Sequence, residues 1–311
     1  MTIRNVTIVG LGALGILYAG SLAGKMPKEN LRIVADTGRI KSYREKGILR
    51  NGRAMDFQYM LPEETVEPAD LILIAVKYEG LENALKAIHN HVGPGTILLS
   101  LLNGIRSEED IAAVYGWDKV LFCVAQGMDA VKEGNALTFT RHGLLCIGDT
   151  KAGPASDKLI AVRDFFEQTG IPYVIDPDMR KRMWGKFMLN VGINQTVAVY
   201  EGDYGSVQRP GEARDVMIAA MREVLPLAAA EGVNLGEEDI EYWLSVVDPL
   251  NPAGKPSMRQ DTEAKRKTEV ELFSGTVLEL SKKHGIPAPV NRMLNDKIRE
   301  MEDGYLHKKP L

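Results

Sequence analysis

Apolar runs recur at regular intervals along the first half of the chain. They are five to seven residues long, rich in Val, Ile and Leu, and alternate with stretches of helical periodicity. Buried strands are predicted at residues 3–9, 31–35, 71–76, 96–101 and 120–124, with helices between them at 13–24 and 79–91. This alternation is typical of a parallel sheet covered by helices on both faces. Residues 137–140, 144–147 and 171–175 are candidate strands that would extend the sheet.

The pattern changes after Asp176-Pro177, where the signals become helical. Turns that contain Gly or Pro separate the predicted helices. These helices span 179–200, 210–231, 237–247, 257–284 and 288–302. The sequence therefore predicts an α/β domain over residues 1–176 and an all-α domain over residues 177–311. A cleft between two such domains is the expected ligand site.

Three glycines stand in the spacing G-x-G-x-x-G within VGLGALG, residues 9–15, directly after the first predicted strand. Gly10 permits a tight turn, Gly12 lets the backbone approach a pyrophosphate, and Gly15 allows close packing of helix on strand. The N–H groups at the start of the following helix favour phosphate. Asp36 ends the second strand, where a carboxylate accepts hydrogen bonds from ribose hydroxyls. Together these features favour dinucleotide binding by a Rossmann-type doubly wound sheet. A purely structural role for the glycine turn is the alternative.

A polar stripe crosses the helix predicted at 179–200. Lys186, Asn190 and Asn194 are spaced four residues apart, and most other positions are apolar. A helix that is apolar nearly all round is buried, so its polar side chains need partners. Either these residues form a network with neighbouring helices, or the stripe faces the cleft and contacts a polar ligand.

The helix predicted at 257–284 supplies a complement to this stripe. Glu269 shares one helical face with apolar and threonine side chains, so it is expected to point toward the core or the cleft. Lys186 is then available to pair with it, as a structural ion pair or as part of a site. Ser257 begins the sequence SMRQ, which matches a capping box with Gln260 at the third helical position. A capping serine can also present its hydroxyl to a ligand.

These residues together resemble the ketopantoate reductase (2-dehydropantoate 2-reductase) family over essentially the whole chain. The matching motifs are GLGALG at 10–15, AVKYEG at 75–80, LLNGI at 101–105, WGKFMLNVGIN at 184–194 and PSMRQDTEAKRKTEVE at 256–271. The resemblance implies an enzyme, an NAD(P)H-dependent oxidoreductase that reduces a 2-oxo acid. The expected reaction is the reduction of ketopantoate to pantoate, in pantothenate and coenzyme A biosynthesis.

The resemblance also implies roles for the matching residues. Lys186 is the expected general acid, and Glu269 is expected to line the site near the cofactor. The expected substrate-binding residues are Asn103, Asn190, Asn194 and Ser257. The expected cofactor-binding residues are Gly10, Leu11, Gly12, Ala13, Leu14, Gly15, Asp36, Lys77, Asn103 and Ala130.

Two departures from the family pattern bear on specificity. Family members commonly carry a basic residue at the position of Asp36, which suits NADP(H), whereas the acid here favours NAD(H); Arg39 follows three residues later. Tyr204 stands where some members place a further substrate-binding asparagine. The alternatives are a reductase of another 2-oxo acid, a non-catalytic dinucleotide-sensing protein, and a related 3-hydroxy-acid or polyol dehydrogenase.

Composition narrows the partners. The 311 residues carry a formal net charge of −4, which favours neither nucleic acid nor an anionic membrane as a partner. Cys123 and Cys146 lack metal-ligand spacing and fit a reducing compartment, so we expect a cytoplasmic protein without a metal. His89 and His91, beside Gly93-Pro94, are expected at a solvated helix end. A small-molecule substrate is the expected partner, and a homodimer is possible.

Overall fold

A computed structural model describes residues 1–151 and 153–306 of the chain. The chain divides into two compact units, Met1–Met179 and Arg180–Leu311. In the described residues, the first unit contains all the strands, and the second is helical. The division lies close to the expected boundary at residue 176. None of the described helices has both the length and the apolar character that a membrane span requires.

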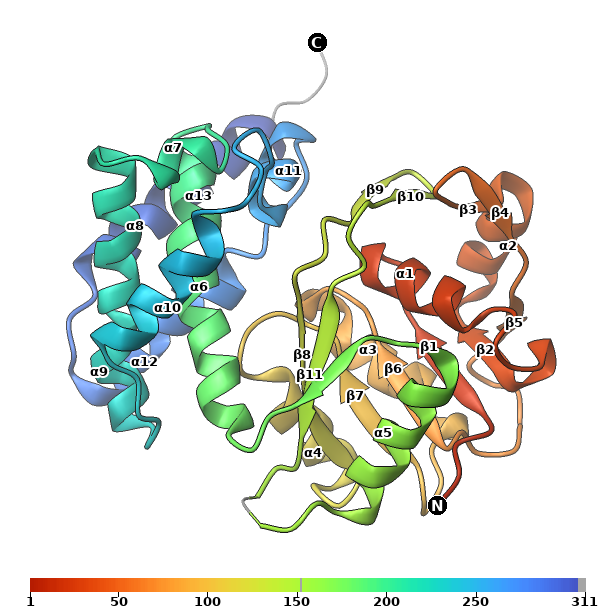
Figure 1. Ribbon diagram of the computed structural model, residues 1–311. Coiled ribbons are helices and arrows are strands. Elements are labelled where there is room, and N and C mark those ends of the chain that lie inside the picture. The colour runs from red at the N-terminus through yellow and green to blue at the C-terminus, as the bar shows by residue number, and fades with distance from the viewer. Residues whose placement is uncertain (152, 307–311) are drawn as a thin grey trace. The chain divides into compact units, whose positions relative to one another are not determined.

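The first unit alternates strands and helices (Figure 1). Its strands are β1 (Val6–Val9), β2 (Leu31–Val34), β3 (Ile48–Arg50), β4 (Arg53–Met55), β5 (Gln58–Met60), β6 (Leu71–Ile74), β7 (Ile97–Ser100), β8 (Val120–Gln126), β9 (Val131–Glu133), β10 (Ala136–Thr138), β11 (Leu144–Gly148) and β12 (Tyr173–Ile175). Its helices are α1 (Ala13–Leu22), α2 (Thr37–Lys46), α3 (Leu81–Ala87), α4 (Ser107–Tyr115) and α5 (Asp157–Thr169), with short 3₁₀ turns at Lys28–Asn30, Tyr78–Gly80 and His89–His91.

The described strands form two sheets. The larger has eight strands in the order β12-β11-β8-β7-β6-β1-β2-β5, and all neighbours are parallel except β8 and β11. The smaller has the order β4-β3-β10-β9. The predicted strand at 137–140 therefore does not extend the main sheet, because β10 pairs with β3 and β9 instead. The expected strands at 144–147 and 171–175 do extend it, as β11 and β12.

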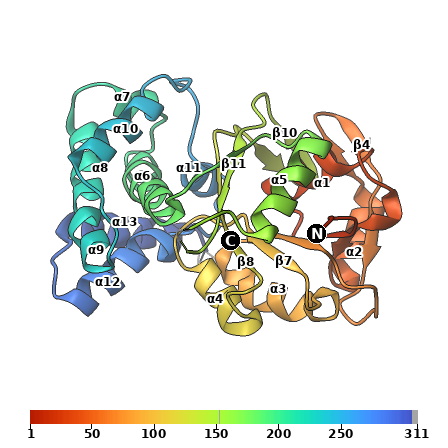
Figure 2. The same cartoon turned by 60° about the horizontal axis from the view of Figure 1, so that its bottom comes forward.

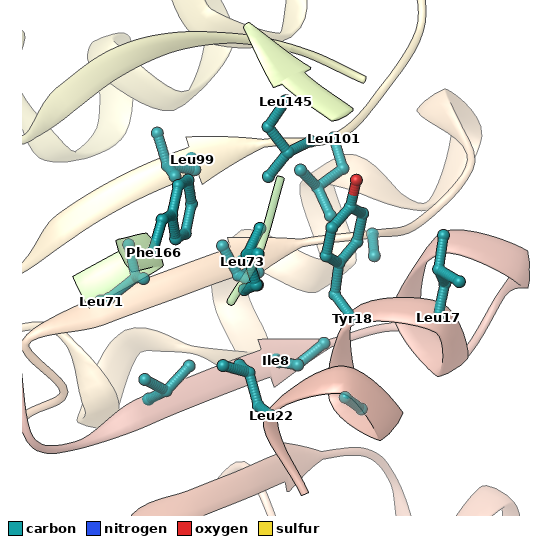
Figure 3. Close-up of a cluster of buried hydrophobic side chains, with 14 of the residues drawn as sticks. Ile8, Leu17, Tyr18, Leu22, Leu71, Leu73, Leu99, Leu101, Leu145 and Phe166 are labelled. Carbon is teal, nitrogen blue, oxygen red and sulfur yellow. The ribbon is translucent and has the colours of Figure 1, made fainter. Parts of the chain in front are cut away.

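Helices cover both faces of the large sheet, as the doubly wound pattern predicts (Figure 2). Buried side chains of α1 and α5 pack on one face, and those of α3 and α4 pack on the other. In the first layer, Tyr18 of α1 and Phe166 of α5 converge with leucines from β6, β7 and β11 (Figure 3). His91 is fully buried, not solvated as expected, and its Nδ1 lies 3.1 Å from the hydroxyl of Thr7 on β1.

The second unit is a bundle of helices (Figure 1). They are α6 (Met179–Val199), which begins at the unit boundary, α7 (Gly205–Gln208), α8 (Glu212–Arg222), α9 (Val224–Ala230), α10 (Glu237–Val247), α11 (Ser257–Glu263), a π-helical turn η4 (Glu271–Gly275), α12 (Thr276–His284) and α13 (Pro289–Leu306). The helix α6 lies among α8, α10 and α13 in both views (Figures 1 and 2). Most of its apolar side chains are buried as predicted, with Phe187, Met188, Val191 and Val197 at most 1% exposed.

Two predicted helices are interrupted. The helix expected at 210–231 breaks at Glu223, because Pro226 in the first turn of α9 has no N–H to continue the ladder. The helix expected at 257–284 ends at Glu263. Lys265 adopts a left-handed conformation there, with φ of 52°, and residues 264–270 are not helical. Ser257 and Glu269 therefore do not share one continuous helix.

Candidate active site

Four parallel strands of the first unit end side by side. Val9 of β1 is in register with Val34 of β2 and with Ile74 of β6, which is in register with Ser100 of β7. Most of the expected cofactor residues follow these strand ends directly: Gly10 to Gly15 after β1, Asp36 after β2, Lys77 after β6 and Asn103 after β7. The chain passes from β2 to β6 on opposite sides of β1, which makes this edge a topological switch point, the usual ligand position in such sheets.

The three motif glycines are needed for different reasons. Gly10 has a φ of 93°, and an added Cβ would lie 2.7 Å from the carbonyl oxygen of Ala75, which directly follows the neighbouring strand β6. A Cβ at Gly15 would lie 1.9 Å from the carbonyl oxygen of Gly10, so close packing of α1 on β1 requires that glycine. Gly12, the N-cap of α1, differs, because its Cβ would meet Ala75 at an ordinary 3.5 Å. Protein packing explains Gly10 and Gly15, whereas the bare backbone at Gly12 fits the close approach of a phosphate.

Asp36 has a structural partner as well as an exposed position. It is the N-cap of α2, and its Oδ1 accepts a hydrogen bond of 2.8 Å from the backbone N–H of Arg39. Its Oδ2 lies 3.5 Å from Nε of Arg39. Both side chains are largely exposed, so the ion pair itself contributes little stability. Arg39 nonetheless lies beside the carboxylate and balances its charge.

The predicted stripe in the second unit lies on α6. Asn190 and Asn194 are 8% and 5% exposed, and Lys186 is half-buried. The Nδ2 group of Asn194 donates to Oδ1 of Asn190 over 3.2 Å. The two asparagines of the stripe are therefore buried, whereas its lysine is partly exposed.

Asn194 joins α6 to the start of α11. Its Oδ1 accepts hydrogen bonds from the backbone N–H of Met258, at 3.2 Å, and from the hydroxyl of Ser257, at 3.1 Å. A backbone N–H can only donate, so it assigns the Asn194 oxygen and amide without ambiguity. The expected capping box is wrong: Pro256 is the N-cap of α11, and the Ser257 hydroxyl donates to Asn194 instead. The structure thus brings together Asn190, Asn194 and Ser257 of the predicted substrate site.

Glu269 lies between α11 and η4. The end of α11 is a Schellman motif, in which the N–H of Arg266 donates to the carbonyl of Asp261 and that of Lys265 to Thr262. Glu269 itself is half-buried, and its carbonyl accepts hydrogen bonds from the N–H groups of Leu272 and Phe273 in the π turn. Its place in an irregular segment is a result that helical periodicity could not predict.

Comparison with known families matches both units. Residues 6–152 match the family described as "Ketopantoate reductase PanE/ApbA", and residues 178–302 match "Ketopantoate reductase PanE/ApbA C terminal". The chain belongs to the ketopantoate reductase family. Family membership confirms the predicted oxidoreductase class and the predicted fold of a doubly wound sheet followed by an all-helical region.

Individual relatives of the family agree. The chain is 28% identical to a 2-dehydropantoate 2-reductase of Vibrio cholerae over 303 residues, which covers 97% of this chain and 99% of that protein. It is 26% identical to one of Aquifex aeolicus, over 96% of this chain and 97% of that protein. Among solved structures, a PanE/ApbA family ketopantoate reductase from Ralstonia eutropha superposes with a TM-score of 0.82 at 24% identity, covering 97% of this chain and 100% of that one. D-mandelate dehydrogenase in complex with NADH superposes with a TM-score of 0.86 at 20% identity, covering 97% of this chain and 99% of that one. This similarity is one of fold.

In this family member a buried chain of hydrogen bonds braces the loop that carries Asn103. The N–H of Leu102 lies 3.3 Å from the hydroxyl of Ser100, which lies 2.7 Å from that of Ser107, which in turn donates to Glu108 over 2.9 Å. Burial raises the pKa of Glu108 to about 7. The sequence patterns did not lead us to expect Ser107 or Glu108 near the site. The acidic run SEED at 107–110, just after the LLNGI motif, is the sequence feature that could have indicated them.

A second brace holds the loop after β8, which carries the expected cofactor residue Ala130. The carboxylate of Asp129 accepts hydrogen bonds from the backbone N–H groups of Thr140 and Arg141, and from the Thr140 hydroxyl. Ala130 is half-buried and packs against the core of the first unit. Within the described residues, no group of three or more His, Cys, Asp or Glu side chains could hold a metal ion.

Proposed function

We propose that this protein reduces ketopantoate to pantoate with a reduced nicotinamide dinucleotide, in pantothenate and coenzyme A biosynthesis. The observation that carries the proposal is the hydrogen-bonded set of Asn190, Asn194 and Ser257, with Lys186 one helical turn before Asn190 on α6, in a chain that belongs to the ketopantoate reductase family. Family membership alone does not identify the 2-oxo acid that is reduced. The directions of the hydrogen bonds in this set indicate which functional groups the substrate carries.

The cofactor half of the proposal rests on the first unit. The backbone from Gly10 to Gly15, with Leu11, Ala13 and Leu14, would hold the pyrophosphate at the N-terminus of α1, where N–H groups concentrate positive potential. Lys77, Asn103 and Ala130 would contact the rest of the dinucleotide. Bound there, the reduced nicotinamide supplies a hydride. The residues around it bind and orient the dinucleotide.

Lys186 is the proposed general acid. It is half-buried on α6, so its ammonium group can approach a ligand without complete desolvation. As the ketone carbon of a 2-oxo acid gains a hydride, negative charge develops on the oxygen, and Lys186 Nζ donates a proton to that oxygen. Glu269 is the proposed acidic partner that keeps the lysine protonated and oriented.

The hydrogen-bond directions favour a substrate that carries a hydroxyl group. Ser257 has one proton and gives it to Asn194, so toward a ligand its oxygen can only accept. Asn190 accepts from Asn194, so toward a ligand its Nδ2 group donates. Lys186 and Asn190 thus offer donors that suit a carboxylate and a ketone, and Ser257 offers an acceptor that suits a hydroxyl. Ketopantoate has all three groups.

The alternative is a 2-oxo acid with a different side chain. Tyr204, which departs from the family pattern, lies close to the loop that leads into α11, because its N–H donates to the carbonyl of Gly254 over 2.9 Å. An aromatic ring at that position would suit a bulkier or more apolar substrate than asparagine would. The alternative is tested together with the main proposal.

The deciding experiment compares ketopantoate with its analogue that lacks only the hydroxyl group, in steady-state assays with NADH and NADPH. We expect a preference in kcat/KM of about a hundredfold or more for ketopantoate, because a site built to bind a hydroxyl rejects the analogue without it. Ser257→Ala should remove most of that preference. Equal rates for both acids in the wild-type protein, or a stronger reaction with an aryl 2-oxo acid, would support the alternative.

For the cofactor we propose that NADH serves at least as well as NADPH. The Asp36 carboxylate follows β2 at the N-cap of α2, suits the ribose hydroxyls of NADH and repels a 2′-phosphate. Arg39, which could otherwise pair with that phosphate, already lies 3.5 Å from Asp36. A tenfold or larger preference for NADPH in kcat/KM would contradict the proposal. A homodimer is also proposed, and its test is the solution mass.

A further inference from the structure

The last helix of the chain carries a row of polar side chains along one face. We define the α13 stripe as Asn295, Arg299, Glu302 and Tyr305. Their spacings of four, three and three residues place them on one side of a helix. Most helices in the second unit use their buried face for apolar packing, so a polar row on α13 calls for partners.

Every member of the α13 stripe contacts the segment around Glu269. The contacts run from Asn295 Nδ2 to the Ser274 hydroxyl at 2.9 Å, from Arg299 to the carboxylate of Glu271, from Glu302 Oε1 to the backbone N–H of Thr268 at 2.6 Å, and from the Tyr305 hydroxyl to the carbonyl of Arg266 at 2.9 Å. Successive residues of the stripe, taken toward the C-terminus of α13, contact residues that lie progressively earlier in the segment. The stripe and the segment from 266 to 274 are thus joined along their whole length.

Glu302 makes the contact nearest to Glu269 along the chain. It is 7% exposed, and its partner Thr268 is 4% exposed. A buried carboxylate that accepts from an N–H forms a charge-assisted hydrogen bond, about twice as strong as a neutral one. On the other side of Glu269, the N–H of Val270 donates to the Thr268 hydroxyl over 3.2 Å. The backbone is therefore held immediately before and after Glu269.

Residues 264–270, the first part of this segment, are not helical. The segment begins at Lys265 in a left-handed conformation and ends in the π turn Glu271–Gly275, where Gly275 N–H reaches back to Val270 over 3.0 Å. Irregular backbone of this kind costs free energy and persists where the surroundings hold it in place, and π turns are frequent at functional sites. The α13 stripe provides that support.

We propose that Glu302 is a positioning residue of the reductase: by holding Thr268, it fixes the direction in which Glu269 points. The proposal rests on the function proposed above, because it takes Glu269 as a residue of the site. It assigns Glu302 no contact with substrate or cofactor.

The first test measures the segment directly. In Glu302→Ala, hydrogen–deuterium exchange of peptides spanning residues 264–275 should increase by about tenfold or more, while exchange in α6 is unchanged. Glu302→Gln should restore protection, because its Oε1 can still accept from Thr268. Glu300→Ala, at an exposed position of the same helix, is the matched control and should have no effect. Unchanged exchange of the segment in Glu302→Ala would overturn the proposal.

The second test asks whether Glu302 acts through Glu269. Glu302→Ala should lower kcat by about tenfold to a hundredfold, because a small misplacement of a catalytic group costs that much. In a Glu269→Gln background the same substitution should change kcat by no more than about twofold, since residues that act as a unit are not additive. The proposal would be overturned if Glu302→Ala lowered kcat by the same factor in the Glu269→Gln background as in the wild-type protein. If the wild-type protein does not reduce ketopantoate, the proposed function fails by itself, and the exchange measurement alone decides the role of Glu302.

Discussion

Replacing Glu108 by glutamine should make the first unit more stable at alkaline pH and leave it nearly unchanged at acidic pH. Glu108 is 2% exposed, and its carboxylate accepts a hydrogen bond from Ser107 over 2.9 Å. A glutamine keeps the shape and the accepting oxygen but carries no charge. The effect therefore isolates the cost of burying the ionised carboxylate.

The magnitude follows from the pKa. Burial raises the pKa of Glu108 from 4.5 to about 7. Between these values the folded protein binds more protons than the unfolded chain, so stability falls as the pH rises through that window. Each unit of pKa corresponds to about 1.4 kcal/mol, so the wild-type protein loses about 3 kcal/mol above pH 7 that the glutamine variant keeps. Below pH 4.5 both proteins bury a neutral group, and the difference disappears.

The assay is thermal unfolding of both proteins by circular dichroism at several pH values between 5 and 8. A difference of about 3 kcal/mol corresponds to a shift of about 6 to 12 °C in the transition of a unit of this size. Glu109→Gln is the control, because Glu109 is exposed on the same helix and loses the same charge. A difference in Tm that stays constant across this pH range, or a variant that is less stable than wild type at pH 8, would refute the reasoning.

Four further predictions concern the site and the fold. Lys186→Ala should lower turnover by about a hundredfold or more with cofactor affinity intact, and near wild-type turnover would exclude Lys186 as the general acid. Asn190→Ala should raise the KM for ketopantoate about tenfold, whereas Asn194→Ala should also lower Tm because Asn194 anchors α11; equal thermal stability of the two variants would contradict this difference. Asp36→Arg should raise the kcat/KM ratio of NADPH to NADH, and an unchanged ratio would remove Asp36 from cofactor selection. Burial lowers the pKa of His91 to about 4, so the wild-type protein should lose about 3 kcal/mol as the pH falls from 6.5 to 4, and His91→Asn should flatten that loss in urea titrations.

The elements that the sequence predicts well are those with strong local patterns. The central strands are continuous apolar runs that are buried on both faces, and α6 combines an apolar surface with a four-residue polar repeat. Local patterns do not predict the small sheet, because its strands are only three residues long and depend on pairing between β3 and β10, far apart in the chain; only the strand at 137–140 is expected, and in the main sheet. The burial of His91 is not visible in the local sequence for a similar reason, since this residue of the 3₁₀ turn His89–His91 packs against Thr7 of β1, far away in the chain.

The segment between α11 and η4, which carries Glu269, shows where local patterns fail. Periodicity favoured one helix through 257–284, and no glycine or proline lies between 258 and 274 to predict a break. The helix ends because Lys265 adopts a left-handed conformation, which costs a residue with a Cβ about 1 to 2 kcal/mol. Contacts with α13, above all the charge-assisted bond from the Thr268 N–H to Glu302, which is 34 residues away in the chain, offset that cost. Long-range contacts therefore override the local helical pattern immediately before Glu269.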